Sequence, residues 1–244
     1  MNRIDPEDVA KRYNALDIII DADDLWHLET KKRISDFIKE CAQKYPSFMQ
    51  GKTLNAGSAG YSYGLSEDNI LHIDVAEKHL KDRPNSIIGD IQNIPLEKDQ
   101  IQSVICVGSV LNYCDPFKVI NEFHRIMSSG GFLILEFECS KTYELLLKRG
   151  YNKNAFFVET IFDAHGDKEQ IWYFSEGFIH SLLTSFGYEI IAIKRFHLLS
   201  PLFLRLTGKS NLSARFIKLD GLLSKIPILN KICSNVILLC RKKN

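Results

Sequence analysis

The 244 residues predict an α/β fold with a mostly parallel sheet, and two observations carry that prediction. From Lys52 onward, short apolar runs alternate with helical patterns of roughly ten to fifteen residues, which is the signature of repeated βαβ units. The runs are nearly continuous in apolar residues, as expected for strands covered on both faces. With 45% hydrophobic and 25% charged residues, the chain is an ordinary globular protein, neither disordered nor fibrous.

Two helices are expected before the sheet begins. Asp5 can cap a helix that starts at Pro6 and runs to about Tyr13. A second helix is expected from about Asp24 to Tyr45, where apolar residues recur every three or four positions before Pro46. We therefore expect residues 1–50 to form an N-terminal helical lid.

The core is expected over residues 51–196. Five strands are predicted in its first part, at residues 53–57, 70–75, 86–89, 103–108 and 132–137. A helix is expected after the first of these strands, and another over residues 115–127, followed by a Gly130-Gly131 turn into the next strand. Further on, the pattern predicts a hairpin over residues 155–174, a helix from Ser175 to Gly187 and a strand over residues 188–196.

The C-terminal part of the chain is strongly basic. Residues 197–244 contain nine basic residues and one acid, although the whole chain has a net charge of +1. We expect a basic helical insert at 197–234 and a final core strand with a basic tail at 235–244. Apolar runs mixed with Lys and Arg over 198–233 indicate contact with a membrane surface or a lipid-linked substrate, and a solvated basic face is the alternative.

Composition also limits where the protein works and what it binds. The six cysteines occur singly, which argues against a zinc site or a disulfide framework, so we expect no metal and a reducing cytoplasmic environment. The first residues are acidic where a signal peptide would be apolar, and no run of about 18 apolar residues occurs. A nucleic-acid partner is not expected, because the total charge is balanced and few aromatic residues accompany the basic tail.

Three expected strand ends carry residues suited to a nucleoside. The first strand runs into the small-residue turn Gly57-Ser58-Ala59-Gly60, which lets backbone amides approach a ligand closely. Asp74 ends the second strand and can accept both hydroxyls of a ribose. Asp90 follows the third strand, where it can accept from an adenine amino group while Ile91 packs on the ring. These residues predict one crevice at the carboxyl edge of the sheet.

This order of residues resembles the class I S-adenosylmethionine-dependent methyltransferases of the small-molecule type. The resemblance covers residues 52–138 and extends more weakly over residues 174–190. It implies a Rossmann-like three-layer sandwich whose seven-stranded, mostly parallel sheet has an antiparallel last strand. It also implies S-adenosylmethionine as the cofactor. The glycine turn and the end of the fourth strand would lie near its methionine part. The end of the second strand would bind the ribose, and the end of the third strand would contact the adenine. The residues given these roles are Asn55, Gly57, Ser58, Gly60, Asp74, Val75, Asp90, Ile91, Gly108 and Ser109.

Two positions depart from the family pattern. Asn55 stands where the family usually has Asp or Glu, and Ala59 stands where it usually has Gly. An alanine forced to positive φ costs about 1 kcal/mol or more. The departures keep open a non-catalytic binding or regulatory protein that retains the fold.

The methyl acceptor is predicted only in outline. We expect methyl transfer to oxygen or nitrogen of a small-molecule or glycan-type acceptor. No spacing singles out a catalytic base. The candidates are Tyr113 and His27, and Asn112, Glu138 and His165 are further candidates. A nicotinamide-dependent oxidoreductase is a further alternative, because Gly57 and Asp74 satisfy part of a dinucleotide fingerprint whose remaining glycines are missing.

Overall fold

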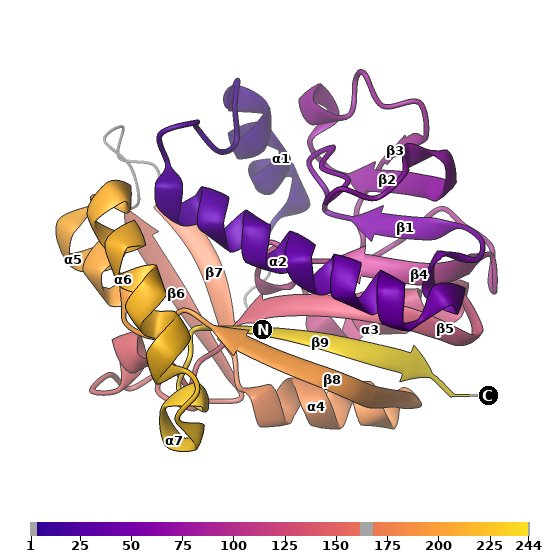
Figure 1. Cartoon of the computed structure of the whole chain (residues 1–244). Helices are drawn as coiled ribbons and strands as arrows, with labels where there is room; N and C mark the ends of the chain where they lie inside the picture. The colour runs from indigo at the N-terminus through magenta and orange to yellow at the C-terminus, as the bar shows by residue number, and fades with distance from the viewer. Residues whose placement is uncertain (1–3, 162–167, 244) are drawn as a thin grey trace.

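A seven-stranded sheet organises the protein in this computed structural model, which describes residues 4–161 and 168–243. The strands lie in the order β3-β2-β1-β4-β5-β9-β8 (Figure 1). β9 is antiparallel to both of its neighbours, and the remaining pairs are parallel, which confirms the predicted arrangement. The strands are β1 Thr53–Ala56, β2 Ile70–Asp74, β3 Ser86–Ile88, β4 Ile101–Cys106, β5 Met127–Glu138, β8 Tyr188–Phe196 and β9 Asn235–Lys242.

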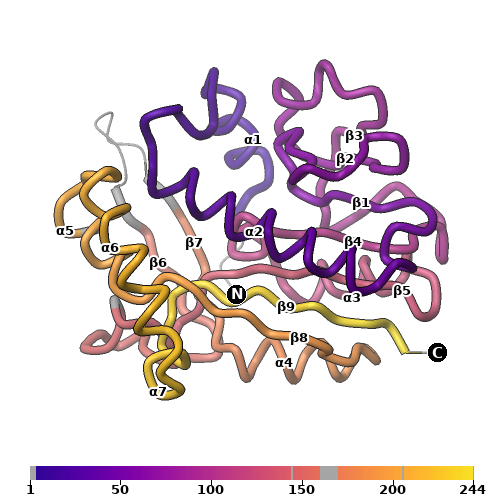
Figure 2. The backbone as a smooth tube through the Cα atoms, in the orientation of Figure 1, coloured from indigo at the N-terminus to yellow at the C-terminus, as the bar shows by residue number. Residues whose placement is uncertain are grey.

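Helices cover the two faces of the sheet and complete the three layers. α2 (Leu25–Lys44) packs Phe37 and Ile38 on one face of the sheet. α3 (Pro116–Ile126) and α4 (Glu176–Ser185) pack on the other face. β5 serves both cores, because Ile134 belongs to the first core and its neighbour Leu135 to the second. Figure 2 shows α2 crossing in front of the central strands, with α4 below β8.

The N-terminal α1 (Pro6–Ala15) begins as predicted. Asp5 caps it by accepting a hydrogen bond from the Glu7 amide, and Pro6 occupies its first turn. α1 lies above the carboxyl ends of β1 and β2 (Figure 1). It therefore adjoins the sheet edge at which the sequence predicts a ligand.

The prediction of a helix after the first strand is wrong. Between β1 and β4 the only helical segments of the described chain are short 3-10 turns, at Glu67–Asn69 and Glu77–His79. The reason is local geometry, since Gly57, Ala59 and Gly60 all have positive φ, which no right-handed helix accommodates. The connection from β1 to β2 is therefore an extended loop.

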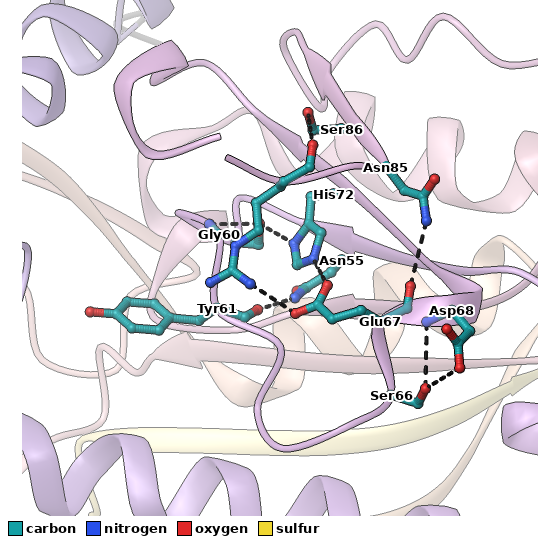
Figure 3. Close-up of polar contacts among 11 residues, drawn as sticks. Asn55, Gly60, Tyr61, Ser66, Glu67, Asp68, His72, Asn85 and Ser86 are labelled. Atoms are coloured by element: carbon teal, nitrogen blue, oxygen red, sulfur yellow. Dashed lines mark hydrogen bonds and ion pairs between the residues drawn. The ribbon is translucent and has the colours of Figure 1, made fainter. Parts of the chain in front are cut away.

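A polar network fixes this loop in place of a helix. The buried His72 on β2 shares a 2.9 Å hydrogen bond with the Ser58 hydroxyl and another of 2.9 Å with Glu67. Glu67 also accepts from Arg83 at 3.0 Å, and the Gly60 amide donates to the Ser58 hydroxyl. Figure 3 shows His72 between the glycine loop and Glu67. Side chains from both ends of the loop thus hold it against β2.

The Gly130-Gly131 prediction also needs correction. Both glycines lie inside β5, not in a turn before it. The register with β4 shifts at this point, Gly130 has a φ of +76°, and a side chain on Gly131 would come within 2.5 Å of the Gln102 carbonyl oxygen. The pair is needed for an irregular, close strand pairing.

Two further units lie outside the main sheet. The predicted hairpin is formed by β6 (Ala155–Ile161) and β7 (Lys168–Phe174), and its tip, with His165, lies outside the described residues. The insert between β8 and β9 is helical as predicted, with α5 (Ser200–Thr207), α6 (Ser210–Leu223) and α7 (Pro227–Asn230). In the described part of the chain, no helix combines the length and apolar content needed to cross a bilayer.

Candidate functional site

A cavity of about 540 Å³ lies at the carboxyl ends of β1, β2, β3 and β4, under α1 and the start of α2. The residues that follow these four strands open onto it together, which is where open α/β sheets bind their ligands. The predicted cofactor residues that line it are Gly57, Ser58, Asp74, Val75, Asp90, Ile91, Gly108 and Ser109. The structure therefore gathers eight of the ten predicted residues around one space.

Asn55 and Gly60 do not line the cavity, which corrects their predicted position. The buried Asn55 side chain donates a 2.5 Å hydrogen bond to the Tyr61 carbonyl. Gly60 lies against the backbone of His79, whose carbonyl oxygen would be 2.5 Å from any added Cβ. Both residues shape the loop and leave contact with the cavity to Gly57 and Ser58.

Asp74 presents a rigid carboxylate. Its Oδ2 accepts from the Ala59 amide at 2.8 Å and its Oδ1 from the Ala76 amide at 2.9 Å. Burial raises the pKa of the Asp74 carboxyl above its usual range, against the effect of these hydrogen bonds. Each oxygen keeps acceptor capacity, so the group can take two neighbouring hydroxyls. Ala59 itself has a positive φ of 45°, so the loop keeps at this position a backbone conformation that favours glycine.

Asp90 combines capping with a place on the cavity wall. Its carboxylate accepts from the Gln92 backbone amide at 2.9 Å and from the Gln92 side chain at 3.2 Å. Asp90 therefore caps the turn that follows β3. Asp90 nevertheless lines the cavity beside the buried Ile91.

The turn after β4 is held by Glu136, which the sequence analysis missed. Gly108 and Ser109 both have positive φ, and their amides donate to one Glu136 oxygen at 2.8 and 2.7 Å. The other oxygen accepts from Asn235 at 2.7 Å. The carboxylate is fully buried, and burial raises its pKa. An acid inside the apolar run Leu133–Phe137 is the signal that could have identified it.

The opposite wall comes from α1, α2 and β7. It contains the predicted candidate His27, whereas the candidates Tyr113 and Glu138 line the cavity from the turn after β4 and from the end of β5. The Tyr113 ring packs edge-on against Tyr13 at 6.5 Å, and the Arg12 guanidinium lies 5.1 and 5.2 Å from the centroids of Tyr13 and Tyr113.

Asn112 has a structural role, which removes it from the catalytic candidates. It is buried, its amide group donates to the carbonyl oxygens of Glu138 and Trp172, and its oxygen accepts from the Glu138 amide. These bonds tie the turn after β4 to β5 and β7.

His27 lies at the start of α2 in contact with an acid. Its Nδ1 is 2.6 Å from Asp24 Oδ2, and Asp24 also caps the helix by accepting from the His27 amide. Partial burial opposes ionisation of Asp24, but hydrogen bonds from Ser210 and His27 and the charge of His27 lower the pKa of Asp24 overall. The dyad is thus built from α2 and, through Ser210, from α6.

Lys31 is a second residue that the sequence analysis missed. Its Nζ lies 3.0 Å from the centroid of the Tyr61 ring, and both residues line the cavity. Partial burial lowers the pKa of the Lys31 ammonium. In a polar helix such a lysine has no sequence signal that separates it from Lys32, which pairs with Asp36 on the exposed side.

Residues 56–135 match the family model of a methyltransferase domain. None of the curated proteins matches the sequence.

Similar solved structures cover nearly the whole chain at low identity. Geranyl diphosphate C-methyltransferase from Streptomyces coelicolor A3(2) is 12% identical, with a TM-score of 0.57 over 97% of this chain and 98% of that chain. An S-adenosylmethionine-dependent methyltransferase from Clostridium acetobutylicum is 14% identical, with a TM-score of 0.55 over 98% and 99%. The [4+2]-cyclase SpnF is 15% identical, with a TM-score of 0.55 over 87% and 80%. At these identities the likeness shows the fold alone.

Proposed function

We propose that this chain, whose residues 56–135 match a methyltransferase domain, is a class I S-adenosylmethionine-dependent methyltransferase that transfers a methyl group to oxygen or nitrogen of a small-molecule or glycan-type acceptor. The observation that carries the proposal is one cavity that is lined both by the strand ends suited to a nucleoside and by His27 of α2. A ligand held by the strand ends would present its reactive end toward that opposite wall.

The residues present fit S-adenosylmethionine group by group. The Asp74 carboxylate suits the two ribose hydroxyls, and Asp90 with Ile91 suits the adenine. Lys31 supplies a cation for the carboxylate of the methionine part, and among the described residues no acid pairs with it. The cofactor contributes a methyl group already activated on a sulfonium, so the protein mainly positions the reactants.

An oxygen or nitrogen acceptor must lose a proton, and the His27–Asp24 dyad is suited to remove it. The Asp24 carboxylate at Nδ1 favours the tautomer whose Nε2 is free to accept a proton, and it stabilises the imidazolium that results. His27 therefore acts as the base in this proposal, with Asp24 orienting it.

The acceptor end of the cavity is aromatic. Tyr13, Trp26, Tyr113 and Tyr173 line it together with Ile171. Aromatic faces pack on the apolar faces of sugar rings and on planar rings, which supports a glycan-type or small cyclic acceptor.

The six cysteines are free thiols, most of them buried, which supports a reducing cytoplasmic location.

Calorimetric titration with S-adenosylhomocysteine tests the cofactor half of the proposal. Wild-type protein should bind this ligand and not NAD, and Asp74→Ala should weaken binding about 100-fold because two hydrogen bonds to a charged group are lost. The matched control is Asp82→Ala, which removes an exposed acid from the same connection between β2 and β3. Circular dichroism establishes that each variant is folded.

A screen with radiolabelled S-adenosylmethionine tests the acceptor half. At least one of the tested amino sugars, hydroxylated sugars or small phenols should give a labelled product, and the label should be on oxygen or nitrogen. Label on carbon would contradict the proposed acceptor atom and favour the chemistry named for the Streptomyces structure. Folded wild-type protein that binds no adenosyl ligand would overturn the proposal in favour of a non-catalytic binding protein.

A further inference from the structure

The helical insert between β8 and β9 carries an exposed apolar stripe. Along α6, Leu212, Leu219 and Leu222 lie on one side of the helix, and Leu222 is 63% exposed. The stripe continues into the next turns with Ile226 and Ile228, which are 47% and 79% exposed. Figures 1 and 2 show α5, α6 and α7 together at the β8 side of the molecule, away from β3.

Exposed basic side chains accompany this stripe. Arg215, Lys218, Lys225 and Lys231 are all exposed. The one acid of the insert, Asp220, is buried and accepts hydrogen bonds from the amides of Leu199 and Ser200. The exposed surface of α6 and α7 therefore presents apolar and positive groups without an acid of its own. We call it the insert face: Leu212, Arg215, Lys218, Leu219, Leu222, Lys225, Ile226, Ile228 and Lys231.

The insert face is mounted firmly on the rest of the protein. The side of α6 opposite the stripe buries Ser213 and Ile217, and Arg33 of α2 donates to the Ile217 carbonyl. At the start of α6, Ser210 accepts from the Trp26 amide and donates to Asp24. The inner side of α6 therefore packs on the rest of the protein, and the apolar stripe on its outer side stays exposed.

We propose that the insert face docks the protein on an anionic membrane surface. Leucine and isoleucine side chains on a helix lying in the interfacial plane enter the boundary between headgroups and acyl chains, while neighbouring Lys and Arg meet the anionic headgroups. The rest of the chain has a net negative charge, since the total is +1 and the last 48 residues are strongly basic. Repulsion of that body from the same surface orients the insert toward the lipid.

Vesicle co-sedimentation of the full chain tests this proposal. Wild-type protein should bind mixed phosphatidylglycerol–phosphatidylcholine vesicles, release them as salt is raised, and leave pure phosphatidylcholine vesicles unbound. The triple variant Arg215→Gln/Lys218→Gln/Lys225→Gln should lose about fivefold in affinity per residue, about 100-fold in all. Leu219→Ser/Leu222→Ser/Ile228→Ser should lose at least tenfold.

The matched control is Lys81→Gln/Lys98→Gln/Lys118→Gln, which removes the same charge from exposed lysines of the core and should bind vesicles like wild type. Calorimetry with S-adenosylhomocysteine shows whether each variant is intact, so the docking proposal can fail while the proposed methyl transfer stands. Failure of the wild-type protein to bind anionic vesicles would overturn the docking proposal. So would self-association in light scattering that the leucine variant abolishes, because the insert face would then be an interface between proteins.

Discussion

The two walls of the cavity are built in different ways. The sheet wall consists of residues that end or follow a strand, namely Gly57, Asp74, Asp90 and Gly108, and positive φ at the two glycines shapes the turns after β1 and β4. The helical wall takes Arg12, His27 and Lys31 from α1 and α2, and Tyr173 from the distant β7.

The walls also differ in charge. The sheet wall carries the carboxylates Asp74 and Asp90, whereas the helical wall carries the cations Arg12 and Lys31. A ligand with hydroxyl and amino groups at one end and a carboxylate at the other is complementary to this arrangement. Residues at strand ends can be found from sequence motifs, and these make up the part of the cavity proposed for the nucleoside, whereas the proposed reacting part depends on packing between distant segments.

The largest expected effect concerns the sheet wall. In Gly57→Ala the new Cβ would lie 2.4 Å from a Val110 methyl group, at a φ of +68°. We expect the free energy of unfolding to fall by about 3 kcal/mol, from overpacking together with left-handed strain. Urea denaturation measures it.

Gly208→Ala is the matched control, because its φ is +63° and no atom would lie within 4 Å of the Cβ. It should lose only about 1 kcal/mol. Equal losses in the two variants would show that contact with Val110 does not constrain the sheet wall.

On the helical wall, His27→Ala should lower the methylation rate about 100-fold, as expected for removal of a general base. The affinity for S-adenosylhomocysteine should stay unchanged, because His27 lies on the acceptor side. Initial rates with any acceptor found in the screen measure the effect, and the exposed His180→Ala is the control. A rate equal to that of wild type would remove the dyad from the reaction.

Lys31→Met tests the charge difference between the walls. It should weaken S-adenosylhomocysteine binding about tenfold through loss of a partly exposed ion pair. It should leave 5′-methylthioadenosine binding unchanged, because that ligand lacks the carboxylate. Calorimetry with both ligands measures the difference, and Lys39→Met on the exposed side of α2 is the control. Parallel losses for both ligands would contradict the assigned contact.

The smallest expected effect is a gain in stability. Ala59 has a φ of +45°, which favours glycine, so Ala59→Gly should raise the free energy of unfolding by up to about 1 kcal/mol. Urea denaturation measures it. Ala56→Gly, in the regular and buried β1, should lower stability and serves as the control. A destabilised Ala59→Gly would mean that the loop gains more from the alanine side chain than it loses to strain.

Sequence patterns predicted most elements because their signals are local. Asp5-Pro6 starts α1, Pro46 follows the end of α2, and the apolar runs mark the strands. The helix expected after β1 failed because the positive φ of Ala59 depends on its amide reaching Asp74, fifteen residues away. Likewise Gly130 and Gly131 read as a turn, although a close strand pairing requires them.

The sequence by itself determined the α/β fold, the strand-end residues that line one side of the cavity and the basic character of the insert, because each follows from composition or from neighbouring residues. Only the tertiary structure decided that Asn55 and Gly60 do not line the cavity, that Glu136 binds the turn after β4, and that Lys31 lies over the Tyr61 ring. It also decided that His27 meets Asp24 beside Ser210. These arrangements depend on packing between segments far apart in the chain, where a side chain's partner has no fixed spacing in the sequence.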